Sequence, residues 1–277
     1  MTSKQAKKLG IESHSQISPY LQKCSLLLSA NESYQNVEEE IFMLTGRTIS
    51  HSTHQRLVHR QKFDSPVLQE SVEEMSVDGG NIRLRTSLGE PCRYQNYKAI
   101  SLHHLCVGAF FHENEALINW VNEQPFSAPF YCLGDGHSGI WNIITEIGNK
   151  EERIEILDWY HLMENLHKVG GSEQRLELVK NHLWQGRVDA AILEFQDWSA
   201  PVVTNFINYL EKHRPRIVNY GYYQAEGISI GSGSVESLVK QIGARVQLPG
   251  AQWKVENVSQ VLRHRCAYLN GQLSARP

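Results

Sequence analysis

Three acidic residues stand in local sequences that can present a carboxylate to a reaction site. Asp78 lies beside two glycines in VDGG, Asp135 follows an apolar run in LGDGHSG, and Glu236 stands in SGSVES, at the start of an amphipathic stretch. In α/β sheets, loops at the carboxyl ends of strands present such side chains without disturbing the core. Converging carboxylates repel one another unless cations neutralise them, and Mg²⁺ or Mn²⁺ prefers oxygen ligands. Two such ions would favour phosphodiester cleavage or strand transfer, so we expect these three acids to be metal ligands and catalytic residues.

A purely structural interpretation exists for the same residues. Asp78 and Asp135 are typical turn formers beside glycine, and Glu236 would supply negative charge to the first turn of a helix. The motif DWYHL also has two interpretations. Its three-residue spacing would bring Asp158 and His161 to one face of a helix, where they would orient the site. Alternatively, Asp158 caps the helix and His161 is partly buried.

The elements that must position these residues belong to an α/β sheet. From residue 70 onward, the pattern predicts the order β-β-α-β-α-β. The predicted strands are MSVDGGNIRLRTS, AISLHHLCVGAFF, FYCLGDG and RIEILDW, and the helices between them are ENEALINWVNEQ and SGIWNIITEIG. Residues 163 to 223 are helical in pattern throughout, which predicts an all-α insertion, and GSGSVESLVKQIG becomes a helix with one apolar stripe.

A helical segment precedes this sheet. Residues 33 to 45 predict a helix that ends at Gly46, and Ser50 is a good N-cap for a second helix, HSTHQRLVHR. The pair suggests a helix-turn-helix with residues 50 to 60 as the recognition helix, and an ordinary helical hairpin is the alternative. We therefore expect a DNA-binding segment over 1–62 and a catalytic domain over 70–277. The candidates for recognition of DNA ends are Arg47, Arg56, His59 and Arg60.

The net charge of −3 conceals an uneven distribution along the chain. Lys and Arg exceed Asp and Glu by 3 in residues 1–62 and by 5 in 237–277, whereas acids exceed bases by 9 in 63–171 and by 2 in 172–236. Basic ends can hold DNA although the whole chain is acidic.

The five cysteines form no C-x-x-C pair, and no apolar stretch resembles a secretory signal or a membrane span. We expect a cytoplasmic protein that does not bind membranes.

The motifs occur in a characteristic order. VDGG, YCLGDGHSGIW and EILDWYHLMENL are followed by a long block, GISIGSGSVESLVKQIGARVQLPGAQWKVENVSQVLRHRCAYLNG. Over roughly residues 30 to 272, the chain resembles the transposases of ISKra-type bacterial insertion sequences, which are similar in pattern to mutator-like DDE transposases. The resemblance implies an RNase H-like fold, with Asp78, Asp135 and Glu236 as the DDE triad that binds two divalent ions. Asp158 and His161 match the family's DWYHL motif.

The activity that the resemblance implies is cleavage at the ends of an insertion sequence followed by strand transfer into target DNA, carried out by a homo-oligomer assembled on double-stranded DNA. Family members are longer at the N-terminus, so a truncated, catalytically silent DNA-binding derivative is the alternative. A metal-independent hydrolase with a carboxylate pair, such as a glycosidase, is a third interpretation. The cations expected to hold DNA phosphates are Lys240, Arg245, Lys254, Arg263 and Arg265.

Overall fold

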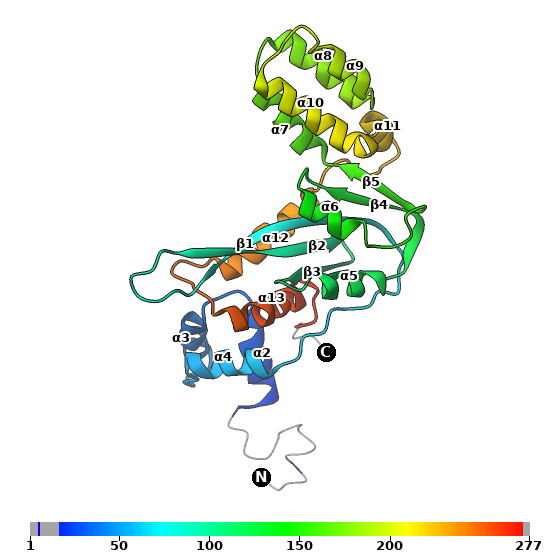
Figure 1. Cartoon of the computed structure of the whole chain (residues 1–277). Coiled ribbons are helices and arrows are strands. Elements are labelled where there is room, and N and C mark those ends of the chain that lie inside the picture. The colour runs from blue at the N-terminus through cyan, green and yellow to red at the C-terminus, as the bar shows by residue number, and fades with distance from the viewer. Residues whose placement is uncertain (1–4, 6–16, 274–277) are drawn as a thin grey trace.

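A five-stranded mixed sheet lies at the centre of the computed structural model, which describes Gln5 and residues 17–273 (Figure 1). The strand order is β3-β2-β1-β4-β5. Strand β2 is antiparallel to both β1 and β3, and β4 is parallel to both β1 and β5. The strands are β1 Val72–Leu84, β2 Arg93–Leu102, β3 Cys106–Phe110, β4 Phe126–Gly134 and β5 Arg153–Leu157. The predicted α/β class with a mixed sheet is confirmed.

One predicted strand is in fact two. The run AISLHHLCVGAFF contains the end of β2, a tight turn and all of β3, so the order begins β-β-β and not β-β. His103 and His104 make the turn in the left-handed region, at φ of 31° and 62°. Non-glycine residues adopt this region uncommonly. Because no glycine marks the turn, the sequence did not indicate that the chain reverses direction at these two histidines.

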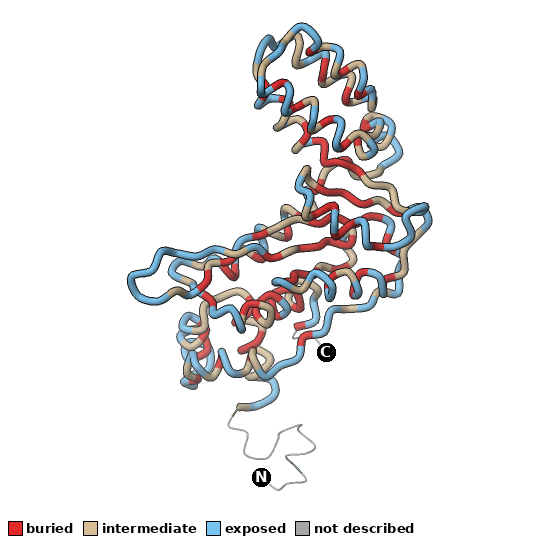
Figure 2. Tube along the Cα trace, viewed as in Figure 1, coloured by how far each residue is buried: buried red, intermediate tan, exposed pale blue. Residues whose placement is uncertain are grey.

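Helices cover both faces of the sheet because its strands alternate their side chains. Ala99 belongs to an apolar cluster with residues of α12 (Gly233–Val246) and α13 (Val255–Leu269), whereas its neighbour Ile100 belongs to a cluster with residues of α5 (Asn114–Asn122) and α6 (Ser138–Ile144). Buried residues accordingly follow the central strands in Figure 2. Among the described residues, no helix combines the length and apolarity that crossing a membrane requires.

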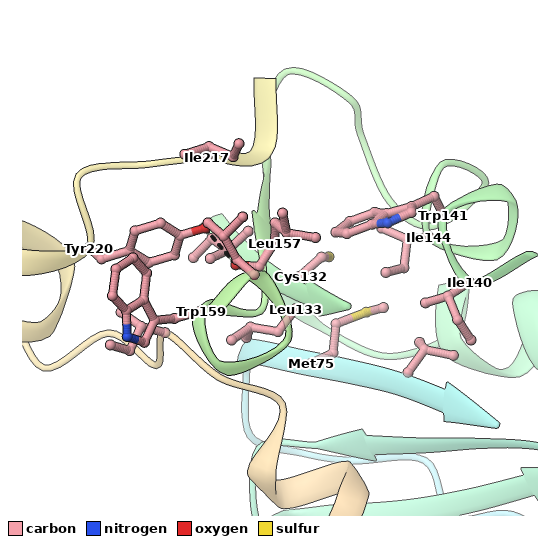
Figure 3. Packing of buried hydrophobic residues seen from close by; sticks show 14 of the residues in the cluster. Met75, Cys132, Leu133, Ile140, Trp141, Ile144, Leu157, Trp159, Ile217 and Tyr220 are labelled. Atoms are coloured by element: carbon pink, nitrogen blue, oxygen red, sulfur yellow. Dashed lines mark hydrogen bonds between the residues drawn. The ribbon is translucent and has the colours of Figure 1, made fainter. Parts of the chain in front are cut away.

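A lobe of helices stands beyond β5, at one end of the molecule (Figure 1). Tyr220 donates from its hydroxyl to the carbonyl of Leu157 at the end of β5 (2.8 Å), and the ring of Trp159 packs against that of Tyr220 (Figure 3). The ring of Trp159 also packs against Trp184. A single apolar cluster thus continues from the sheet into the lobe. The predicted helical stretch 163–223 lies within this lobe. Its elements are α7 Trp159–Val169, α8 Glu173–Trp184, α9 Val188–Leu193, α10 Pro201–His213, a 3₁₀ turn at Arg214–Arg216, and α11 Tyr220–Ala225.

Within residues 17–273, three helices precede the sheet: α2 Pro19–Ser29, α3 Tyr34–Thr45 and α4 His51–Arg60. Most of the predicted segment before residue 17 lies outside the described residues. Ser50 is the N-cap residue of α4, as predicted, but its side chain makes no capping hydrogen bond. Glu38 of α3 replaces it, accepting from the backbone N–H of His51 at 2.7 Å and lying 3.0 Å from its Nδ1. A carboxylate is stabilised at a helix N-terminus, so this contact fixes α4 against α3.

The C-terminal helices hold α2 by its last carbonyl groups. Arg245 of α12 donates to Ser29, His264 of α13 lies 2.9 Å from the carbonyl oxygen of Leu26, and Arg265 donates to Ala30. Arg265 also donates twice to the carbonyl oxygen of Gln241. The expectation that Arg245 and Arg265 bind DNA phosphates is therefore wrong, because both are buried and already bonded within the protein. They satisfy carbonyls that the end of a helix leaves without partners.

We predict that Arg265→Met lowers the free energy of unfolding by about 2–3 kcal/mol, because buried carbonyl oxygens lose a charged donor. Arg263→Met is the matched control on the same helix. Arg263 is 42% exposed in its side chain and pairs with Glu113 at 2.7 Å, so its loss should cost less than about 1 kcal/mol. Urea unfolding followed by circular dichroism measures both variants, and equal destabilisation would contradict the assigned role of Arg265.

Candidate functional site

The sheet brings Asp78 and Asp135 to equivalent positions on neighbouring strands. Val77 of β1 pairs with Gly134 of β4 in parallel register, so each aspartate directly follows one member of this pair. Adjacent strands lie about 4.8 Å apart, which places the two residues side by side at the carboxyl end of β4. Glu236 stands in the first turn of α12, which packs across β1. The predicted strand, turn and helix positions of the three acids are confirmed.

The pKa of Asp78 reflects the charges of both other predicted acids, Asp135 and Glu236. Burial is the main cause that raises the pKa of Asp78, and the charges of Asp135 and Glu236 raise it further. His161 acts in the opposite direction, as does the hydrogen bond that Gly79 donates to Asp78 Oδ1 at 2.6 Å. The negative charges of Asp135 and Glu236 therefore make ionisation of Asp78 less favourable. A site of this kind is well suited to a cation.

Glu236 has a direct neighbour in His161, whose Nε2 lies 3.8 Å from Glu236 Oε1. One ligand atom from each of Asp158, His161 and Glu236 lies within 4.8 Å of the others. Glu236 belongs both to this group and to the three predicted acids. Both predicted members of the DWYHL motif are thus beside the triad, with His161 half-buried and Asp158 fully buried.

Asp158 is occupied by hydrogen bonds on both oxygens. Oδ1 accepts from the backbone N–H of His161 (2.9 Å), which makes Asp158 the N-cap of α7, as one of the two interpretations predicted. Oδ2 accepts from the backbone N–H of Ser232 and from its hydroxyl, the latter at 2.6 Å. Ser232 is the N-cap residue of α12, the helix that bears Glu236. The carboxylate of Asp158 therefore joins the starts of two helices, and it orients the site by fixing α12.

Helix α10 supplies residues that sequence reasoning missed. The ring of Tyr209 covers Gly136, where an added Cβ would lie 2.5 Å from it, and Lys212 donates to Ser138 Oγ at 2.9 Å. Both contacts hold the turn that carries Asp135. The charges of Asp135 and Asp158 raise the pKa of Tyr209, although burial is the larger cause, so its hydroxyl lies near both acids. No sequence signal indicates these contacts, because about 74 residues separate their members.

His213, at the end of α10, is also buried beside this turn. Its ring packs against Tyr209 and Trp141, with centroids 4.7 and 6.3 Å away. Burial lowers its pKa to about 4, and the charges of Lys212 and Arg216 contribute. The imidazole is therefore neutral at pH 7, whereas the neighbouring Lys212 brings a cation to the turn of Asp135.

The remaining cations predicted to contact DNA lie at two places. Arg47, Arg56 and Arg60 are exposed around α4, and His59 is half-buried there, where burial lowers its pKa. Of the C-terminal group, Lys240, Lys254 and Arg263 are exposed. Lys254 lies 3.7 Å from Glu256, and Arg263 pairs with Glu113. These exposed side chains can reach a partner, in contrast to Arg245 and Arg265.

No protein-family model matches the chain, and no curated protein matches it.

We predict that Asp158→Asn destabilises the protein by about 2–3 kcal/mol. The amide can still accept from His161, but its NH₂ group would face the two donors of Ser232. Glu164→Gln on the same helix is the control, because its side chain is 63% exposed. Its effect should stay within about 0.5 kcal/mol. Urea unfolding compares the two, and an Asp158→Asn variant as stable as the control would disprove the structural role.

A second prediction concerns pH. Because the folded-state pKa of Asp78 is raised, the folded protein binds its proton more tightly, and stability is lost as pH rises through that pKa. At pH 7, without divalent metal, Asp78→Asn should raise Tm by up to about 3 °C, the shift expected from roughly 1 kcal/mol. Below the ordinary pKa of aspartate, the gain should vanish. The exposed Asp64→Asn is the control, and a Tm decrease for Asp78→Asn at pH 7 would contradict the prediction.

Proposed function

We propose that this chain is a DDE transposase that cleaves and joins DNA strands with Asp78, Asp135 and Glu236. The observation that carries the proposal is the pairing of Val77 with Gly134, which sets the two aspartates side by side, with Glu236 within electrostatic range. The sheet order β3-β2-β1-β4-β5 supports an RNase H-like catalytic fold, as does a helical lobe inserted before the helix of Glu236. The order of motifs in the sequence also supports the proposal of a DDE transposase.

The donor set fits a hard divalent cation. The charges of Asp135 and Glu236 disfavour the ionisation of Asp78, and Mg²⁺ or Mn²⁺ takes carboxylate oxygens as ligands. Asp78, Asp135 and Glu236 would hold two such ions. When bound, the metal would supply charge neutralisation for in-line displacement at a phosphodiester. Asp158 is not assigned as a ligand, because both its oxygens already accept hydrogen bonds from the protein.

The protein's own residues keep the three acids in place. Asp158 fixes the start of α12 and hence Glu236, and His161 lies against the Glu236 carboxylate. Tyr209 and Lys212 fix the turn of Asp135. Rigid placement of this kind reduces the entropic cost of aligning an attacking oxygen with a DNA strand. The lobe thus has a positioning task in the proposed reaction.

Double-stranded DNA is the proposed partner, as element ends and as target. Helices α3 and α4 support a helix-turn-helix, with α4 presenting Arg56 and Arg60 to DNA. Lys240, Lys254 and Arg263 would contact phosphates, which gives affinity without sequence information. Assembly as a homo-oligomer on DNA belongs to the same proposal.

Metal-dependent nicking tests this function. Purified protein is incubated with Mg²⁺ or Mn²⁺ and labelled duplexes made from the DNA that flanks its gene, and we expect strand cleavage that EDTA abolishes. Asp135→Asn should lower the rate by roughly a hundredfold or more, because several kcal/mol of charge stabilisation are lost. Asp64→Asn should cleave like the wild type.

The other outcomes separate the alternatives. Specific binding of the duplex without cleavage in either metal would show a catalytically silent DNA-binding protein. Hydrolytic activity that resists EDTA would favour a carboxylate-pair hydrolase.

A further inference from the structure

A cavity of about 650 Å³ lies beside the acidic site. Its wall includes Tyr160, which stands between Asp158 and His161, and Ser237, which follows Glu236. The loop before α12 and the turn between β2 and β3 complete it. The cavity and the acidic site therefore share two segments of chain, one on α7 and one on α12.

The wall combines polar and apolar side chains. Of the described residues that line the cavity, none is Asp, Glu, Lys or Arg. Hydroxyl, imidazole and amide groups line it together with apolar side chains such as Leu105, Leu238 and Leu269. A phosphate would find no lysine or arginine in this lining, and a metal ion would find no carboxylate. A neutral, flat group with polar edges is a better match, and pockets of about 300–1,000 Å³ hold such ligands.

Tyr160 provides an aromatic surface at this wall. Its side chain packs on Gly231, where an added Cβ would lie 2.7 Å from two ring carbons, yet the residue is 62% exposed. The ring is thus held in place by the backbone without being buried. Exposed aromatic rings near nucleic-acid sites commonly serve as stacking surfaces for bases.

Glu74 fixes two parts of the wall in advance. This buried carboxylate lies 3.1 Å from Nδ1 of His103 in the turn between β2 and β3, and it accepts from the backbone N–H of Ser229 at 3.1 Å. Both partners line the cavity. A cavity whose walls are already ordered needs less rearrangement to bind a ligand.

We propose that this cavity binds one unpaired nucleobase of the DNA strand that enters the acidic site. The inference rests on the proposed function, because DNA brings the base to the cavity. Tyr160 stacks on the base, and the side chains of Ser237 and Gln241 contact its polar edge. The site thereby accepts a nucleotide that has left the duplex next to the phosphodiester to be cut.

The test uses 2-aminopurine, whose fluorescence is quenched by stacking. The first probe is a short duplex with one unpaired 2-aminopurine nucleotide at its end, compared with a blunt duplex by anisotropy and by fluorescence intensity. Wild type and Tyr160→Phe should quench the probe. Tyr160→Ala should abolish quenching and weaken the preference for the unpaired end by about five- to a hundredfold, the range for stacking of one base. Tyr222→Ala, which removes another exposed tyrosine outside the cavity, should behave like wild type.

A second probe, the free 2-aminopurine deoxynucleoside, separates failure of this inference from failure of the proposed function. If the duplex binds without Tyr160-dependent quenching, the cavity does not take a base, and the proposed function is unaffected. If the duplex fails to bind but the nucleoside is quenched only when an aromatic ring is present at residue 160, the cavity binds bases and the transposase proposal is wrong. Quenching of neither probe overturns the inference about the cavity.

Discussion

A carboxylate removed from water must be satisfied by donors, and Asp158 obtains three of them from the starts of two helices. Two consequences follow from this contact. Helix α7 begins where β5 ends, so the lobe is joined rigidly to the sheet. Helix α12 begins at Ser232, so Glu236 in its first turn is held at a fixed place relative to Asp78 and Asp135. If Asp158 lost these bonds, the three acids would still be present but would no longer be aligned.

The acidic site opposes stability in the absence of a cation. Burial and neighbouring charge raise the pKa of Asp78, so ionisation at neutral pH works against the folded state. The surrounding structure offsets this cost through buried apolar contacts on both faces of the sheet. Charged groups that lower the stability of the folded state are typical of functional sites, where activity and stability impose opposing requirements. The helical lobe contributes by covering the Asp135 turn with Tyr209 and by bringing the cation of Lys212 to it.

Sequence reasoning was most successful where the information is local. The strand of Asp78, the turn of Asp135 and the helix of Glu236 followed from adjacent glycines and apolar periodicity. It failed where residues distant in sequence decide the outcome. A basic residue looks the same in sequence whether it contacts solvent or, like Arg265, the carbonyls of a helix more than two hundred residues away. The turn at His103 lacked the glycine or asparagine that would have indicated it.

The bonds from α12 and α13 to the end of α2 have a consequence for synthesis of the chain. Arg245 and His264 are made 216 and 238 residues after their carbonyl partners. At about 5–20 residues per second, α2 therefore waits roughly ten seconds or more on the ribosome for the side chains that secure it. Helices α2, α3 and α4 are made before the strands, but the contacts from α12 and α13 to α2 form only later. Helix α2 of the proposed DNA-binding segment can therefore dock against α12 and α13 only after Asp78, Asp135 and Glu236 have been synthesised.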